Sequence, residues 1–130
     1  MPTTALLHLA DERVQAIKRP QARSSSCMAM CGPGNTVVAG CGVQALIDWK
    51  TAGVGNPGVD LGELRKQVAI FYDDDAPSHV LEGWQRTSGK RVDDIAYWDA
   101  VAALNTPTES YSPYAALRRD DFLRAAIAQL

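Results

Sequence analysis

The sequence predicts a helix-dominated α+β fold, in which one β-hairpin over about residues 36–48 is followed by a bundle of helices. Two β-prone runs, 36–38 and 43–47, are separated by four residues that include two glycines, which is typical of a hairpin. After residue 60 the apolar residues recur at spacings of three and four, the period of helices that bury one face. A chain of 130 residues has room for one domain with its own core.

Helical patterns account for most of the remaining chain. A first amphipathic helix is expected over residues 5–19, just before Pro20. After the hairpin we expect a helix around 61–71, one from Asp75 as N-cap to about Gly89, one over 93–104, and a last one from about Pro113. Residues 20–31 show neither helical nor strand periodicity, and the glycine-rich segment 51–58 is expected to be a loop.

Apolar stripes on these helices identify the side chains that we expect to be buried. They are Leu6, Leu7, Val14, Ile17, Leu61, Leu64, Val68, Phe71, Val80, Leu81, Trp84, Ile95, Trp98, Ala102, Leu123, Ile127 and Leu130. Two runs of mixed charge, at 63–66 and 118–121, are expected to form solvated helix faces. His79 is expected to be an exposed helix residue without a functional role.

Charge and composition argue against several classes of function. A net charge of -2 gives no basic surface for nucleic acid or for an anionic membrane. No apolar run is long enough for a membrane span, and the first residues lack the basic start of a signal peptide, so a cytoplasmic location is expected. The three cysteines are an odd number and both histidines are distant, which favours reduced thiols over a zinc site.

An asparagine precedes the predicted hairpin and an aspartate follows it. Because a hairpin returns the chain to its start, Asn35 and Asp48 are expected to lie close together. Amide and carboxylate oxygens are suitable ligands for magnesium. Taken singly, Asn35 is better explained as a turn residue, and Asp48 is also explained as a cap at the end of a strand.

The run GPGNTVVAGCGVQALIDWKTAGVGNPGVDLGEL, at 32–64, resembles the aminoglycoside phosphotransferase and choline kinase-like family, which has a protein-kinase-like fold. The resemblance extends to residue 130, because AYWDAVAALN and DDFLRAAIAQL are also similar to helices of this family. It implies that 32–130 form the C-terminal lobe of a phosphotransferase. It also implies ATP and Mg²⁺ as cofactors, and a small-molecule hydroxyl as the phosphate acceptor.

The resemblance also assigns roles to single residues. Asn35 would bind the second magnesium ion, and Asp48 would bind magnesium between the β- and γ-phosphates of ATP. Asp60 would be structural, with a carboxylate that accepts hydrogen bonds from the catalytic-loop backbone, although it could equally cap the following helix. Trp49 would pack beside Asp48. The family usually has glutamate where this chain has Lys50.

The chain departs from the family at the catalytic motif itself. His-Gly-Asp is expected at 28–30, but these positions hold Met28, Ala29 and Met30, so no catalytic residue is assigned. A thioether cannot replace the carboxylate that orients the acceptor hydroxyl. The codons needed for 27–30 (TGY, ATG, GCN, ATG) permit His-Gly-Asp when read two bases further on. We therefore hypothesise a frameshift just before Gly32, with residues from about 24 to 31 out of frame and without a selected fold.

Residues 1–31 thus form an atypical N-terminal segment, and they are too few to encode the ATP-clamping N-terminal lobe of the family. The expected function is that of a phosphotransferase-family protein which is truncated and inactive. The alternative is a non-catalytic, pseudokinase-like binding or interaction module, or a remnant. Self-association is expected through the surface that an N-terminal lobe would cover. Asp93, Asp94 and Asp99 are interpreted as ligands for a cationic acceptor or, more simply, as helix caps and solvated charges.

Overall fold

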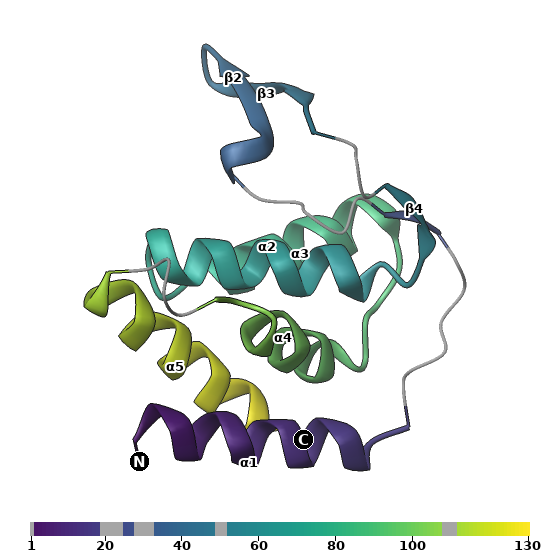
Figure 1. The fold of residues 1–130 in the computed structure, drawn as a ribbon. Helices are drawn as coiled ribbons and strands as arrows, with labels where there is room; N and C mark the ends of the chain where they lie inside the picture. The colour runs from purple at the N-terminus through teal and green to yellow at the C-terminus, as the bar shows by residue number, and fades with distance from the viewer. Residues whose placement is uncertain (1, 19–24, 28–32, 49–51, 108–111) are drawn as a thin grey trace.

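The computed structural model describes residues 2–18, 25–27, 33–48, 52–107 and 112–130 (Figure 1). Within these ranges the order is α1 (Thr3–Ala16), β1 (Ser25–Cys27), η1 (Pro33–Asn35), β2 (Thr36–Ala39), β3 (Gly42–Leu46), β4 (Gly53–Gly55), α2 (Gly58–Phe71), α3 (Ala76–Ser88), α4 (Ile95–Leu104) and α5 (Pro113–Ile127). Five α-helices and two small antiparallel sheets confirm the predicted helix-dominated α+β class in the described part of the chain. No helix described here is long and apolar enough to cross a membrane.

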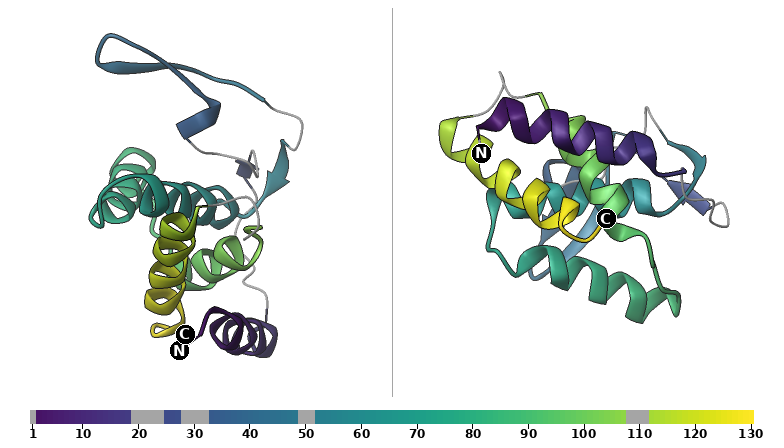
Figure 2. Two further views of the ribbon diagram at one scale, coloured as in Figure 1. Left: turned by 60° about the vertical axis from the view of Figure 1, so that its left-hand side comes forward. Right: turned by 90° about the horizontal axis from the view of Figure 1, so that it is seen from below.

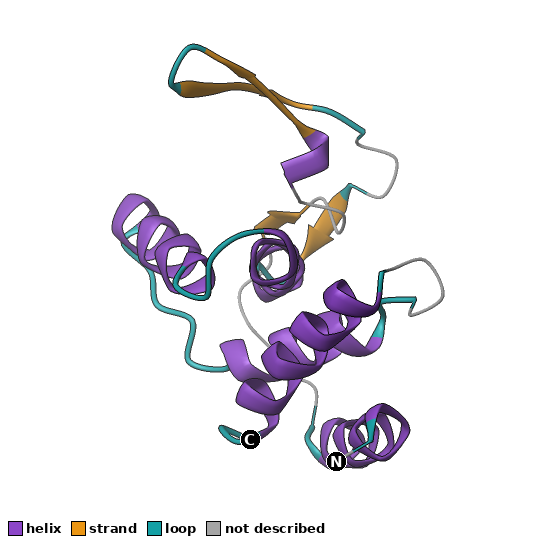
Figure 3. Ribbon diagram, turned by 90° about the vertical axis from the view of Figure 1, so that its left-hand side faces the viewer, coloured by secondary structure: helices purple, strands orange, loops and turns teal. Residues whose placement is uncertain are grey.

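The predicted hairpin is present as the antiparallel pair β2–β3. Its register pairs Thr36 with Leu46 and Val38 with Val43, and an irregularity falls between Val37 and Val38. Gly40 turns the chain with a φ of 63°, a left-handed value that favours glycine. The hairpin stands away from the helices in Figure 1, in the left-hand view of Figure 2 and in Figure 3.

The second sheet was not expected from the sequence. β1 pairs antiparallel with β4, so that Ser25 faces Gly55 and Cys27 faces Gly53. Neither segment alternates apolar and polar residues, and β4 lies within the glycine-rich stretch that predicted a loop. Strand pairing uses backbone donors and acceptors, so it can form where side chains carry no strand signal. Part of the stretch that we expected to have no selected fold is therefore ordered as a strand.

The main core lies where α1 packs against α4 and α5. It contains seven buried residues, four of which are alanines: Leu6, Ala10, Ala100, Ala103, Leu123, Ala126 and Ile127. Small side chains at these positions allow the helix axes to approach closely. Helix α1 is tied at both ends to α5, because Thr3 Oγ1 donates to Asp120 Oδ2 over 2.6 Å and Arg13 Nη1 donates to the carbonyl of Ile127 over 2.9 Å.

Two expected core positions are exposed. Phe71 is 57% exposed and Leu130 is 38% exposed. Phe71 is the last residue of α2 and Leu130 lies beyond the end of α5, where the stripe of each helix runs past its packing partner. Val80, Leu81 and Trp84 are half-buried, because α3 makes its main contact with α2 alone.

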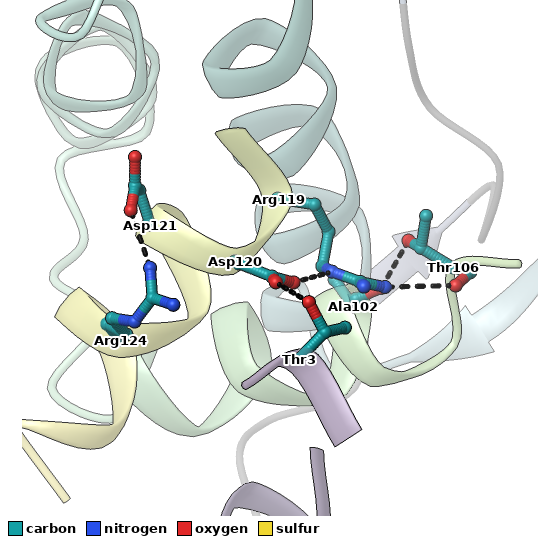
Figure 4. A network of polar contacts seen from close by, with 7 residues as sticks. All are labelled: Thr3, Ala102, Thr106, Arg119, Asp120, Asp121 and Arg124. Carbon is teal, nitrogen blue, oxygen red and sulfur yellow. Dashed lines mark hydrogen bonds and ion pairs between the residues drawn. The ribbon is translucent and has the colours of Figure 1, made fainter. Parts of the chain in front are cut away.

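Both charge runs contain buried, paired side chains, so the expectation that they form solvated faces is wrong for these residues. Arg119 and Asp120 are each 1% exposed, and Lys66 is 4% exposed. Arg119 Nε donates to Asp120 Oδ1 over 2.7 Å (Figure 4). Lys66 Nζ donates to Glu63 Oε1 over 2.6 Å. A charged side chain can be buried when a partner charge lies beside it, and a charge pattern alone does not distinguish a paired run from a solvated one.

Most helix ends follow their capping signals. Gly89 ends α3 with a φ of 67°, and its N–H donates to the carbonyl of Gln85. Ser112 Oγ caps α5 by accepting the N–H of Ala115 over 3.2 Å. Asp75 occupies the N-cap position of α3, but its side chain makes no capping hydrogen bond. Helix α1 spans 3–16 and begins and ends slightly earlier than expected.

Candidate functional site

The end of the hairpin that faces the helices carries both predicted magnesium ligands. Asn35 is the last residue of η1, and its carbonyl accepts the N–H of Ile47 over 2.9 Å. Asp48 follows Ile47 directly, so the backbones of Asn35 and Asp48 lie at the same end of the ribbon. Asn35 is half-buried and Asp48 is exposed, and an exposed carboxylate remains accessible to an ion. Their metal-binding role stays a prediction.

The backbone at Asp48 has an unusual conformation. Asp48 has a φ of 63°, and it is the single non-glycine residue with positive φ in the described ranges. Aspartate tolerates this left-handed region better than most residues, yet the conformation still costs about 1 kcal/mol. Such a conformation persists only where the surrounding structure maintains it, and residues of this kind cluster at functional sites.

The β1–β4 pair brings together two segments that adjoin the candidate site in the sequence. β1 ends at Cys27, directly before the positions that hold Met28 and Met30, and β4 begins at Gly53, five residues after Asp48. The segment that leads into the family's catalytic motif therefore lies beside the segment that leaves Asp48. Residues 28–30, Trp49 and Lys50 lie outside the described residues.

Asp60 lies in the first turn of α2 and is half-buried. It is not the N-cap of this helix, because Pro57 holds that position and Asn56 Oδ1 accepts the N–H of Gly58 over 2.8 Å. A carboxylate in the first turn is favoured by the helix dipole. Helix α2 also contacts η1, the element that ends at Asn35.

Asn56 is a residue that the sequence reasoning did not single out. Its Oδ1 caps α2, while its Nδ2 is buried and has no hydrogen-bond partner among the described residues. An asparagine that precedes Pro-Gly at the start of an apolar helical pattern is the signal that could have identified it.

Asp99 pairs with Arg65 and also lines a cavity together with Arg65 and Arg118, so its role as a ligand for a cationic acceptor stays a prediction. Its side chain is 6% exposed and forms an ion pair with Arg65, with Nη2 3.0 Å from Oδ2 and Nε 3.0 Å from Oδ1. Arg65 also donates to the carbonyl of Pro77, so one guanidinium joins α2, α3 and α4. Of the other two, Asp93 is exposed, and Asp94 is the N-cap residue of α4 without a side-chain capping bond.

The buried Asp99 carboxyl has a pKa above its ordinary value of 3.8, because burial penalises the charged form more than the hydrogen bonds and charge of Arg65 favour it. The folded protein then holds this proton at a pH where the unfolded chain has lost it. The free energy of unfolding is therefore expected to fall as the pH rises from about 4 through the folded pKa.

Asp99→Asn removes this titration and is expected to flatten that part of the pH profile. The measurement is urea unfolding between about pH 3 and pH 7, with the exposed Asp93→Asn as the matched control. The neutral amide pairs less well with Arg65, so a constant loss of stability is expected as well, and the slope is the informative quantity. Parallel profiles for wild type and Asp99→Asn would contradict the assignment.

The site offers few protein ligands for a metal ion. Within the described ranges no group of three or more His, Cys, Asp or Glu side chains is arranged to hold a metal. One carboxylate and one amide oxygen nevertheless fit magnesium, which keeps several waters and binds through one or two carboxylates together with substrate phosphates. The donor set at Asn35 and Asp48 is thus of the kind that magnesium uses when a nucleotide supplies further oxygens.

Residues 31–104 match the model of a family described as a phosphotransferase enzyme family, which is more than half of the chain. The matched range contains Asn35, Asp48 and Asp60, while α1 and α5 lie outside it. No curated protein and no solved structure gives a significant match.

Proposed function

Because the chain belongs to the phosphotransferase enzyme family, we propose that residues 32–130 form the C-terminal lobe of an ATP-dependent phosphotransferase fold, with Asn35 and Asp48 as magnesium ligands. The observation that carries the proposal is the hydrogen bond from Ile47 N to the Asn35 carbonyl, which brings the two backbones together. The left-handed φ of Asp48 supports it independently. In a phosphotransferase, magnesium neutralises charge on the phosphates of ATP.

In this proposal Asn35, Asp48 and Asp60 have different roles. Asn35 presents an amide oxygen and Asp48 a carboxylate from the two ends of one hairpin, so that both can bind a nucleotide-bound cation. The strand pairing and the glycine turn of the hairpin keep these ends together. Asp60 places a negative charge in the first turn of α2, the helix that contacts η1.

The 130 residues on their own are proposed to be inactive in phosphate transfer. The family aspartate that orients the acceptor hydroxyl is replaced by Met30, and a thioether does not accept that proton. Positioning and proton transfer supply a large part of the rate enhancement in such enzymes. The second candidate is therefore a non-catalytic, pseudokinase-like binding module or a remnant, and nucleotide binding separates a module from a remnant.

Mg·ATP is expected to stabilise the protein by about 1 kcal/mol or more when its concentration is about ten times the dissociation constant. For a domain of this size that is a rise of about 3–5 °C in Tm. Asp48→Asn should abolish the shift, because the amide lacks the charge that holds the ion. Asp73→Asn changes an exposed aspartate at the end of α2 and should retain it. Thermal unfolding with and without Mg·ATP measures both.

Two results would contradict the proposed nucleotide binding or the proposed inactivity. No shift in the wild-type protein at millimolar Mg·ATP would contradict nucleotide binding and support the remnant. Phosphate transfer from ATP to a panel of aminoglycosides, choline or sugars, lost in Asp48→Asn, would contradict inactivity.

A further inference from the structure

Helix α3 has the fewest buried residues of the five described α-helices. Of its thirteen residues only Pro77 is buried, whereas five of the ten residues of α4 are buried. Helix α3 packs mainly against α2, while α4 and α5 each contact α2 and also each other. In the right-hand view of Figure 2, α3 lies at the edge of the helical body. Few buried contacts are typical of a segment that opens locally while the rest of the domain stays folded.

The first turn of α3 forms part of the wall of a cavity of about 400 Å³. Pro77 and Ser78 line this cavity from α3. The other helices contribute side chains to the same cavity, among them Arg65 of α2, Asp99 of α4 and Phe122 of α5. A cavity of this volume is of the size that holds a small molecule. A movement of α3 away from α2 would therefore remove one wall and open the cavity to solvent.

A single guanidinium joins the first turn of α3 to two other helices. Arg65 Nη1 donates to the carbonyl of Pro77, and among the described residues this is the one hydrogen bond that links α3 to another helix. Asp99 fixes the rest of the guanidinium, because Oδ1 accepts from Nε over 3.0 Å and Oδ2 accepts from Nη2 over 3.0 Å. Two parallel hydrogen bonds set the orientation of a planar guanidinium. Asp99 therefore directs the remaining donor of Arg65 toward α3.

The segments at the two ends of α3 allow it to move as a unit. Residues 72–75, which precede it, are all exposed, and Gly89, which ends it, has a left-handed φ of 67°. We propose that α3 opens and closes over the cavity, and that Arg65, oriented by Asp99, is the positioning residue that holds it closed. A molecule in the cavity would contact both α3 and Arg65, so its binding would shift α3 toward the closed position.

Arg65→Lys tests the link to α3 separately from the charge on Arg65. Lysine keeps a positive charge beside Asp99, but one ammonium group does not replace the planar guanidinium that reaches Asp99 and the Pro77 carbonyl together. The measurement is native-state hydrogen exchange of the full chain. In the wild-type protein the α3 amides are expected to exchange faster than the α4 amides, through an opening that does not unfold α4. In Arg65→Lys the α3 amides should exchange about tenfold faster, as expected for the loss of one hydrogen bond to a charged group, and the α4 amides should change less than about threefold.

Lys66→Met is the matched control, because Lys66 is the next residue of α2 and pairs with Glu63 of the same helix over 2.6 Å. This variant removes a buried cation without breaking a link to α3, so the ratio of the α3 and α4 exchange rates should stay as in the wild type. Chymotrypsin cleavage after Trp84, which is half-buried on α3, is a second readout and should accelerate in Arg65→Lys alone.

Two outcomes would overturn the proposed movement of α3. In the first, the wild-type α3 amides exchange only together with those of α4, so that α3 has no opening of its own. In the second, Arg65→Lys speeds exchange in both helices equally, which would make Arg65 a general source of stability. Neither variant changes Asn35 or Asp48, so the result is independent of nucleotide binding.

Discussion

Gly62→Ala is expected to lower the free energy of unfolding by about 2–4 kcal/mol, because α2 and α4 are in backbone contact at this position. A Cβ on Gly62 would lie 2.5 Å from the Trp98 carbonyl oxygen and 2.7 Å from its carbonyl carbon. Both are backbone atoms in the middle of a helix, so neither can turn aside as a side chain could. Relief requires that the two helices separate, which loosens the packing around Trp98, itself only 4% exposed.

Gly83→Ala is the matched control for this substitution. Gly83 is also inside a helix, α3, but a Cβ there would meet nothing within 4 Å. Replacing this glycine with alanine should raise the free energy of unfolding by about 0.5–1 kcal/mol, because alanine has less conformational entropy to lose. Urea unfolding of both variants measures the contrast. Equal effects at the two positions would show that helix propensity, rather than the close approach to Trp98, governs Gly62.

Helix periodicity predicted the helices well, because each of them buries a face against a neighbour. Leu61, Val68, Trp98 and Leu123 occupy core positions as the spacing indicated. The wrongly predicted core positions lie at the ends of helices, where the apolar stripe extends beyond the neighbouring helix, as at Phe71. The β1–β4 pair could not be found in the same way, since its hydrogen bonds join backbones of serine- and glycine-rich segments and leave no periodic pattern.

The sequence was sufficient to locate the two predicted magnesium ligands, but not to identify which charged residues form ion pairs. Asn35 and Asp48 could be placed together from the sequence because hairpin geometry alone returns the chain to its start. Arg65 and Asp99 could not be paired in advance, since they lie on different helices and only tertiary packing brings them together. Burial of Arg119 was missed for a related reason: its partner Asp120 is adjacent, so the pair looks like a solvated run.

Asp120→Ala is expected to lower the free energy of unfolding by about 3–5 kcal/mol, the range found when one member of a buried ion pair is removed. The Asp120 carboxylate accepts from Arg119 Nε over 2.7 Å and from Thr3 Oγ1 over 2.6 Å (Figure 4). Without it, the Arg119 guanidinium keeps only the carbonyl of Thr106 as an acceptor among the described residues. A buried positive charge then lacks a counter-charge, and the Thr3 hydrogen bond that joins the start of α1 to α5 is lost.

Asp121→Ala is the control, because it removes the neighbouring carboxylate on the exposed side of the same helix. Asp121 pairs with Arg124 over 2.7 Å, but the two side chains are 75% and 41% exposed. Exposed pairs contribute little, so a change within about 0.5 kcal/mol is expected. Hydrogen exchange adds a second readout: Asp120→Ala should speed exchange of the α1 amides, since Thr3 loses its partner, while Asp121→Ala should not.

The double variant Arg119→Met with Asp120→Leu tests whether the loss comes from an uncompensated charge or from the pair itself. Arg119 Nη2 is buried and has no hydrogen-bond partner among the described residues, so the pair is incompletely satisfied even when intact. Replacing both residues with apolar side chains removes this unsatisfied donor along with the charge. We expect the double variant to recover at least half of the stability that Asp120→Ala loses, because an apolar pair of similar volume often substitutes for a buried ion pair. A double variant as unstable as the sum of its single variants would instead show that the hydrogen-bonded pair is a net source of stability in joining α1 to α5.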